Sequence, residues 1–163
     1  MKKVKDVSKE DKANKGLENY IGYEFVFNDG TIIGLDSIRQ AKVILLLFGG
    51  IWCPPCRGFQ PTLLNFYQEI NKGCLQPKKN VEIIFVTCDN SEEEFLEHFQ
   101  EMPWPAIPYD DPRVAKLEDE LEVDAIPILP ILRKDGTIAK DNVRSLIANK
   151  GVGCFDELFS LSK

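Results

Sequence analysis

Trp52-Cys53-Pro54-Pro55-Cys56 joins two segments of the chain that have different hydrophobic patterns. Before it come an unbroken apolar run, VILLLF over 43–48, and two glycines; after it, apolar residues recur every three or four positions to about residue 70. An apolar run without alternation is typical of a central strand covered on both faces, and the later spacing is typical of a helix. The sequence therefore predicts a buried strand, a glycine turn, the two cysteines and a helix, in that order.

This order places both cysteines where sulfur chemistry is favoured. In an open α/β sheet, reactive groups gather in the crevice beyond the carboxyl ends of the strands. Cys53 is expected at or just before the first helical turn, where unpaired N–H groups and the helix dipole favour a thiolate. Pro54 fits that turn because its missing N–H costs nothing there. Cys56 lies within one turn of Cys53 and is expected to resolve a mixed disulfide.

The segments around the cysteines share a pattern with known redox proteins. They are WCPPCRGF over 52–59 with Pro61, SEEEF over 91–95, EMPW over 101–104 and AIP over 125–127. In this order and spacing they resemble the tryparedoxin and nucleoredoxin branch of the thioredoxin-like family, across roughly residues 20–144. The resemblance implies an α/β thioredoxin-like fold, with a central mixed β-sheet flanked by helices on both faces and an extra N-terminal β-hairpin.

The resemblance also implies roles for single residues. Pro127 is expected to form a cis peptide bond and to face the cysteine pair, and Ile126 to offer its backbone to a substrate strand. Trp52 is expected to be a partly exposed platform beside the thiolate. Arg57 and Arg144 either attract an acidic or glutathione-like substrate or are ordinary solvated charges. The expected site comprises the catalytic Cys53 and Cys56 and the substrate-binding Trp52, Pro54, Pro55, Arg57, Ile126 and Pro127.

Several other residues near the expected site leave alternatives open. Many thioredoxins bury a carboxylate six residues before the first cysteine, where this chain has Leu47. Proton transfer at Cys56 must then use water or a nearby group, for which Asp89 is the candidate. Cys88 is either a small buried thiol or a third redox-active thiol. His98 is expected to be solvated on a polar helix. Cys74 and Cys154 are expected in surface loops, and Trp104 is expected to pack.

The hydrophobic and polar patterns predict the remaining elements and one globular domain over residues 20–163. A polar, flexible tail is expected over 1–19. Two hairpins are expected from glycine-containing turns at 28–30 and 135–136, and short helices from capping residues at Ser91 and Asp111. The expected elements are strands 23–27, 31–33, 43–48, 81–87, 128–133 and 137–139, and helices 35–39, 54–72, 91–100, 111–121 and about 155–159. Residues 142–150 fit no single pattern.

Composition narrows the class of protein. The net charge of −6 argues against nucleic acid or an anionic membrane as partner, and no apolar run approaches the ~20 residues that span a bilayer. Met1 to Asp6 contain no apolar core of a secretory signal, and five cysteines with one close pair do not resemble a disulfide framework. A reducing compartment, cytoplasm or nucleus, is therefore expected. Zinc is disfavoured because there is no second Cys-x-x-Cys and only one histidine.

These observations predict an enzyme that reduces disulfides through a dithiol/disulfide cycle of Cys53 and Cys56. Because the two sulfurs carry the electrons, no bound cofactor and no metal are expected, and an external dithiol or reductase restores the pair. The expected partners are disulfide-containing proteins such as peroxiredoxin-type substrates, met by a monomer. A redox-sensing interaction module of the nucleoredoxin kind and a disulfide-forming oxidase are the alternatives. No residue decides between trypanothione, glutathione and a thioredoxin reductase as electron donor.

Overall fold

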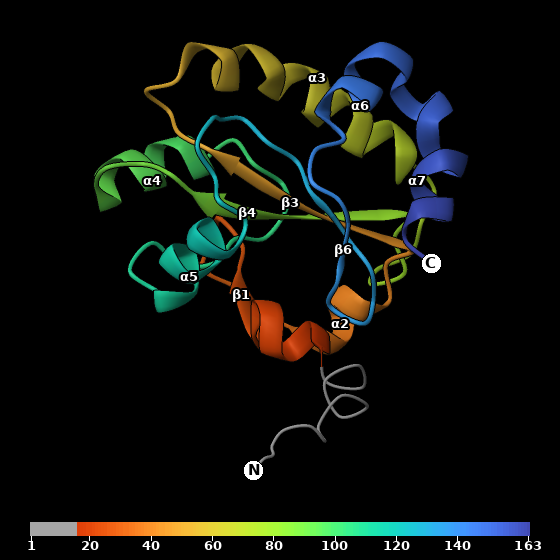
Figure 1. Cartoon of the computed structure of the whole chain (residues 1–163), viewed down its shortest axis with the longest axis horizontal. Coiled ribbons are helices and arrows are strands. Elements are labelled where there is room, and N and C mark those ends of the chain that lie inside the picture. The colour runs from red at the N-terminus through yellow and green to blue at the C-terminus, as the bar shows by residue number, and fades with distance from the viewer. Residues whose placement is uncertain (1–15) are drawn as a thin grey trace.

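The computed structural model of the protein describes residues 16–163 (Figure 1). Most of the expected tail over 1–19 therefore lies outside the described residues. Residues 16–21 are different, because they form a helix in which Leu17 and Ile21 are fully buried. These two apolar side chains are four residues apart, so they share one helix face and enter the core together. The residues that the structure describes thus contribute to the core from Leu17 onward.

A four-stranded sheet in the order β4-β3-β5-β6 forms the centre of the molecule. Its strands are β3 (Val43–Gly49), β4 (Val81–Thr87), β5 (Ile131–Leu132) and β6 (Ile138–Lys140). β3 and β4 are parallel and in register from Val43↔Val81 to Gly49↔Thr87, whereas β5 is antiparallel to both β3 and β6. The predicted mixed sheet is confirmed. The register brings the carboxyl ends of β3 and β4 to the same edge of the sheet.

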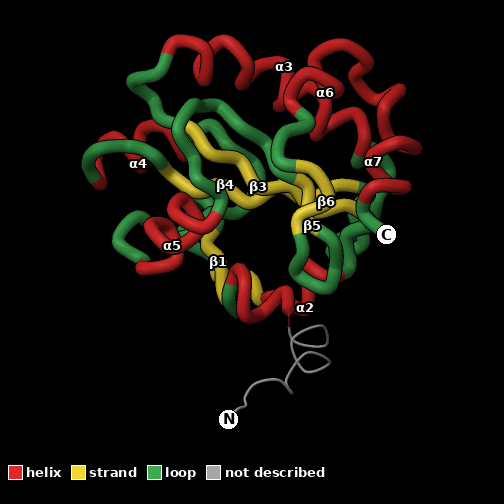
Figure 2. Tube along the Cα trace, viewed as in Figure 1, coloured by secondary structure: helices red, strands yellow, loops and turns green. Residues whose placement is uncertain are grey.

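Helices cover both faces of this sheet, as predicted (Figure 2). Alternate β3 residues face opposite sides: Val43, Leu45 and Leu47 enter one apolar core, and Ile44, Leu46 and Phe48 the other. The first core is covered by α3 (Pro54–Ile70), α4 (Glu92–Phe99), α6 (Arg144–Lys150) and α7 (Phe155–Leu161), and the second by helix 16–21, α2 (Leu35–Arg39) and α5 (Pro112–Glu120). Within 16–163, no helix combines the length and apolar character of a membrane span.

The predicted N-terminal hairpin is present as β1 (Glu24–Val26) and β2 (Ile32–Gly34). It turns through Gly30, whose φ of 89° suits glycine best. Isolated bridges connect it to the main sheet, because Ala106 pairs with Val26 on one side and with Phe85 on the other. The hairpin is thereby attached beside β4, at the edge of the sheet.

Three segments differ from the expected elements. β5 is shorter than 128–133: Ile128 forms only an isolated bridge with Phe48, and Pro130 has no N–H to continue a ladder. The undecided segment 142–150 contains α6. Cys154 is not in a surface loop but is buried in the short 3₁₀ helix η1 (Gly151–Cys154), because the tight turn between α6 and α7 directs it into the first core.

Candidate active site

Cys53 and Cys56 lie together at the start of α3. Cys53 caps the helix, Pro54 and Pro55 form its first turn, and the Cys53 sulfur accepts the N–H of Cys56 at 3.3 Å. The two Sγ atoms are 2.6 Å apart, and each cysteine is only 5% exposed. Both are free thiols. Because disulfides join sulfurs about 2.05 Å apart, a small side-chain movement would bridge this pair.

The two sulfurs have different surroundings. Burial is the main cause that raises the pKa of Cys56 to about 12, and its hydrogen bond with Cys53 adds to this shift. Cys56 therefore keeps its proton at neutral pH and donates it to the Cys53 sulfur. The Cys53 sulfur thus receives two hydrogen bonds, one from an N–H and one from an S–H. This asymmetry suits Cys53 as the attacking sulfur and Cys56 as the one that completes the exchange.

The loop before β5 faces the cysteine pair. The Ile126–Pro127 peptide bond is cis, as the family resemblance implied, and the Ile126 carbonyl oxygen lies 3.7 Å from the Cys53 sulfur. Backbone pairing with β3 starts only at Ile128. Within residues 16–163 the N–H of Ile126 donates no hydrogen bond to a backbone carbonyl. An extended segment of another molecule can therefore form backbone hydrogen bonds with Ile126.

Trp52 lies beside the sulfurs with half of its surface exposed. Its indole N–H donates to the Cys88 carbonyl at 3.0 Å, which fixes the ring against the end of β4. A Cβ at Gly50 would lie 2.5 Å from the indole nitrogen, so the present position of the ring leaves no room for a side chain there. Arg57 is exposed on the next turn of α3, and the guanidinium of Arg144 lies over the Phe59 ring. Pro54 and Pro55 are also exposed.

His98 is buried, so the expectation that it is solvated is wrong. Its Nδ1 is 3.2 Å from Oδ2 of Asp89, and its Nε2 is 3.0 Å from Oε1 of Gln60. The reason is its position on α4, where His98 and Phe99 follow the inward-facing Phe95 at spacings of three and four. The sequence contains this spacing, but the many glutamates of the helix led to the expectation that the whole helix is solvated.

Asp89, the candidate for proton transfer, is buried and engaged through both oxygens. Oδ1 accepts the N–H of Ile51 at 2.6 Å, and Oδ2 accepts the Thr87 hydroxyl at 2.7 Å beside His98. Burial opposes ionisation of this carboxyl, but the hydrogen bonds from His98, Ile51 and Thr87 outweigh it and lower its pKa. Asp89 is therefore a fixed carboxylate that orients His98 and holds the loop before the cysteines.

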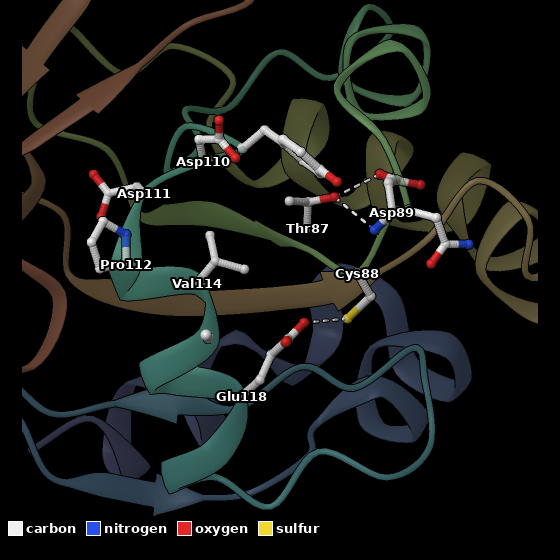
Figure 3. A pocket seen from close by; sticks show the side chains of 11 residues that line it. Thr87, Cys88, Asp89, Asp110, Asp111, Pro112, Val114 and Glu118 are labelled. Carbon is white, nitrogen blue, oxygen red and sulfur yellow. Dashed lines mark hydrogen bonds between the residues drawn. The ribbon is translucent and has the colours of Figure 1, made fainter.

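A groove of about 460 Å³ lies on the other side of Cys88 (Figure 3). Asp110, Asp111 and Glu118 contribute carboxylates to it, and the Cys88 thiol donates to Glu118 at 3.1 Å. Burial, followed by this hydrogen bond, raises the pKa of Cys88, so its thiol stays protonated. Cys88 is thus a half-buried, protonated thiol, which favours the interpretation of a small buried thiol over that of a third redox-active thiol. In the part of the chain that the structure describes, no cluster of three metal-ligating side chains occurs.

Two adjacent thiols at the start of a helix, facing a cis proline, define a centre for thiol–disulfide exchange. The family model described as thioredoxin-like matches residues 40–138. The chain therefore belongs to the thioredoxin-like family, and the predicted resemblance is confirmed. This membership supports a thiol–disulfide oxidoreductase.

Individual relatives agree with this assignment. The tryparedoxin of Trypanosoma brucei brucei is 34% identical over 135 residues, which cover 81% of this chain and 90% of that protein. Human nucleoredoxin is 38% identical over 136 residues, covering 83% and 30% respectively. The crystal structure of tryparedoxin I from Crithidia fasciculata superposes with a TM-score of 0.74 at 30% identity, covering 85% of this chain and 94% of that one. The chain spans only 20–33% of the length of the first plant nucleoredoxins that it matches.

Proposed function

We propose that the protein reduces disulfide bonds in proteins or small thiol compounds through its Cys53–Cys56 pair. The observation that carries this proposal is the 2.6 Å approach of the two sulfurs at the start of α3, beside the Ile126–Pro127 backbone. Cys53 attacks a substrate disulfide, forms a mixed disulfide and releases the first substrate sulfur as a thiolate. Cys56 then attacks Cys53, which releases the second substrate sulfur and leaves a Cys53–Cys56 disulfide.

The surroundings of the pair support binding of an extended substrate segment. The Ile126 backbone offers hydrogen-bonding groups, and the exposed Trp52 ring offers an apolar surface next to the sulfur. Arg57 adds a positive charge that suits an acidic substrate or glutathione. Peroxiredoxin-type proteins, whose catalytic cycle forms disulfides, are the substrates we propose.

An external thiol or reductase must restore the reduced pair after each cycle. One tryparedoxin II structure, 29% identical with a TM-score of 0.70, is a complex with glutathionylspermidine. That neighbour supports a low-molecular-weight thiol as the electron donor here. Comparing reduction of the oxidised protein by glutathione, by a trypanothione-type dithiol and by a thioredoxin reductase identifies the donor.

The test is multiple-turnover reduction of a disulfide-bonded protein by catalytic amounts of this chain, with an excess of thiol donor. We expect turnover in the wild type and none in Cys53→Ser. Cys56→Ser is expected to accumulate a mixed disulfide with the substrate, visible by mass spectrometry under non-reducing conditions. Stoichiometric binding that depends on oxidation state, without turnover, would instead indicate a redox-sensing interaction module.

A further inference from the structure

A small internal chamber lies next to Cys56. Its walls include Leu47, Gly49, Cys56, Gln60, His98 and Pro127. The free volume is about 10 Å³, close to the space that one water molecule needs. A methyl group on Gly49 would lie 3.4 Å from the Cys56 sulfur and 3.9 Å from Cε1 of His98. The missing side chain of Gly49 therefore keeps open the space between the sulfur and the imidazole.

A second hollow begins where the chamber ends. It is a groove of about 260 Å³ whose walls include Arg57, Glu97 and Glu101. Gln60 and His98 line both the groove and the chamber. These two side chains therefore separate the buried Cys56 sulfur from the charged groove, so a proton leaving Cys56 on this side passes them.

The hydrogen bonds of His98 suit a group that changes its protonation. Nδ1–H donates to the Asp89 carboxylate, so in neutral His98 the lone pair belongs to Nε2, which faces the Gln60 amide. That amide donates through its NH₂ group when His98 is neutral and accepts through its oxygen when His98 is charged. Rotation of the Gln60 amide by half a turn therefore gives both ring nitrogens of His98 a hydrogen-bond partner in either protonation state.

The second half of the exchange needs such a group. Cys56 attacks as a thiolate, yet it is a buried thiol whose pKa is about 12. Leu47, also on the chamber wall, offers no carboxylate to take the proton. Asp89 is not among the residues that line the chamber, and its carboxylate already accepts from Ile51, Thr87 and His98.

We propose that His98, oriented by Asp89, accepts the proton of Cys56 across the chamber and passes it to the groove. The inference rests on the disulfide-reductase function proposed above. In this step the Gln60 amide turns away from Nε2 of His98, the Cys56 S–H bond breaks, and its proton moves through one water in the chamber to the freed lone pair of Nε2. The Cys56 sulfur then forms a bond with Cys53, and the bond from Cys53 to the substrate breaks. The substrate sulfur leaves with the electron pair and takes a proton from solvent.

Charged groups from several elements surround His98. Asp89, after β4, lies on its Nδ1 side, and Cys56 contributes a sulfur from α3. Glu97 of α4 and Glu101 after it line the groove together with the opposite charge of Arg57. Three carboxylates and one guanidinium thus lie around the chamber and the groove that His98 separates.

Stopped-flow reduction of dithiobis-nitrobenzoate separates the two halves of the exchange. Attack by Cys53 releases the first coloured nitrobenzoate thiolate, and attack by Cys56 releases the second. This leaving group needs no proton, so the second phase depends on deprotonation of Cys56. In His98→Gln, which retains hydrogen-bonding groups but does not titrate, we expect the first phase to stay within about twofold and the second to slow about 10²-fold near pH 7.

Matched variants separate proton transfer from a purely structural effect. Gly49→Ala fills the chamber without changing a polar group and is expected to slow the second phase alone. Glu93→Gln, on the exposed side of α4, is expected to change neither phase. The second-phase rate of His98→Gln should also lose the wild-type dependence on pH between about pH 6 and 9. Added imidazole should restore this rate in His98→Ala.

The outcomes are distinguishable. An unchanged second phase in a folded His98→Gln variant overturns the relay, as does a pH profile identical to that of the wild type. If His98→Gln does not fold, an unaltered second phase in Gly49→Ala overturns it instead. Failure of the proposed function looks different, because the wild type then releases no nitrobenzoate thiolate in a manner that depends on Cys53.

Discussion

The buried charge network at the start of β4 gives a quantitative test of how this fold is held together. Lys79 Nζ lies 2.9 Å from Oε2 of Glu82, and their side chains are only 7% and 3% exposed. The other carboxylate oxygen accepts the Tyr67 hydroxyl at 2.9 Å and the N–H of Ile83 at 3.0 Å. Burial raises the pKa of Glu82, and Lys79 acts against this rise. Each partner therefore depends on the others.

Glu82→Ala should destabilise the protein strongly. It leaves the Lys79 ammonium buried without its counter-charge, which typically costs about 3–5 kcal/mol. It also removes the acceptor of the Tyr67 hydroxyl, a loss of about 1–3 kcal/mol that partly overlaps with the first. We expect about 4 kcal/mol in total. For a chain of this length, this corresponds to a fall in Tm of about 8–16 °C.

The combined variant Tyr67→Phe, Lys79→Met, Glu82→Leu is the decisive comparison. It replaces the network by apolar groups of similar volume and should lie within about 1 kcal/mol of the wild type. Urea unfolding measures both variants. Disulfide reduction should persist in each while it is folded, because Glu82 is about 16 Å along β4 from the end at Thr87. The reasoning would be refuted if Glu82→Ala lowered the free energy of unfolding by less than about 1 kcal/mol, or if the combined variant were as unstable as Glu82→Ala.

Three further outcomes follow from single sites. Iodoacetamide at neutral pH should label Cys53 and leave Cys56 unmodified, because burial raises the pKa of Cys56 to about 12. Peptide mass spectrometry identifies the labelled cysteine, and a label that appears first on Cys56 would contradict the roles assigned to the two sulfurs. Trp104→Phe should lower the free energy of unfolding, measured in urea, by less than the about 3–5 kcal/mol that truncation of a large aromatic side chain typically costs. The reason is that the buried indole N–H of Trp104 has no hydrogen-bond partner within 16–163, so phenylalanine loses no hydrogen bond. A loss of about 3–5 kcal/mol would contradict this prediction. The hydrogen bond from Arg113 lowers the pKa of Asp111 in the folded protein. The Asp111 carboxylate therefore stabilises the fold at any pH above the pKa that Asp111 has in the unfolded chain. This stabilisation is lost as the pH falls through the lower, folded-state pKa. Asp111→Asn should therefore be less stable near pH 7, by up to about 1 kcal/mol, and equal to the wild type in acid; a difference that does not change with pH would contradict this.

Much of the site could be predicted because its signals are local. The apolar run of β3 and the caps Ser91 and Asp111 each lie within a few residues of the element that they define. The same holds for Cys53 and Cys56, whose spacing places both sulfurs at one helix end. Local signals of this kind survive folding because tertiary contacts reinforce them.

The role of His98 could not be predicted for the opposite reason. Its partners Gln60 and Asp89 are 38 and nine residues away, on other elements. They meet only because α3 and α4 pack against the same face of the sheet. Within α4, polar residues outnumber apolar ones, so composition indicated a solvated helix even though one face is buried.

The sequence by itself thus determined the redox pair, its place between a buried strand and a helix, and the family, because each depends on neighbouring residues or on motif order. Only the tertiary structure decided the burial of Cys154, the helix at 16–21 and the chamber that connects Cys56 with His98. These features arise where segments distant in the chain pack together. Their geometry depends on how two layers of helices close over one sheet, which no local pattern encodes.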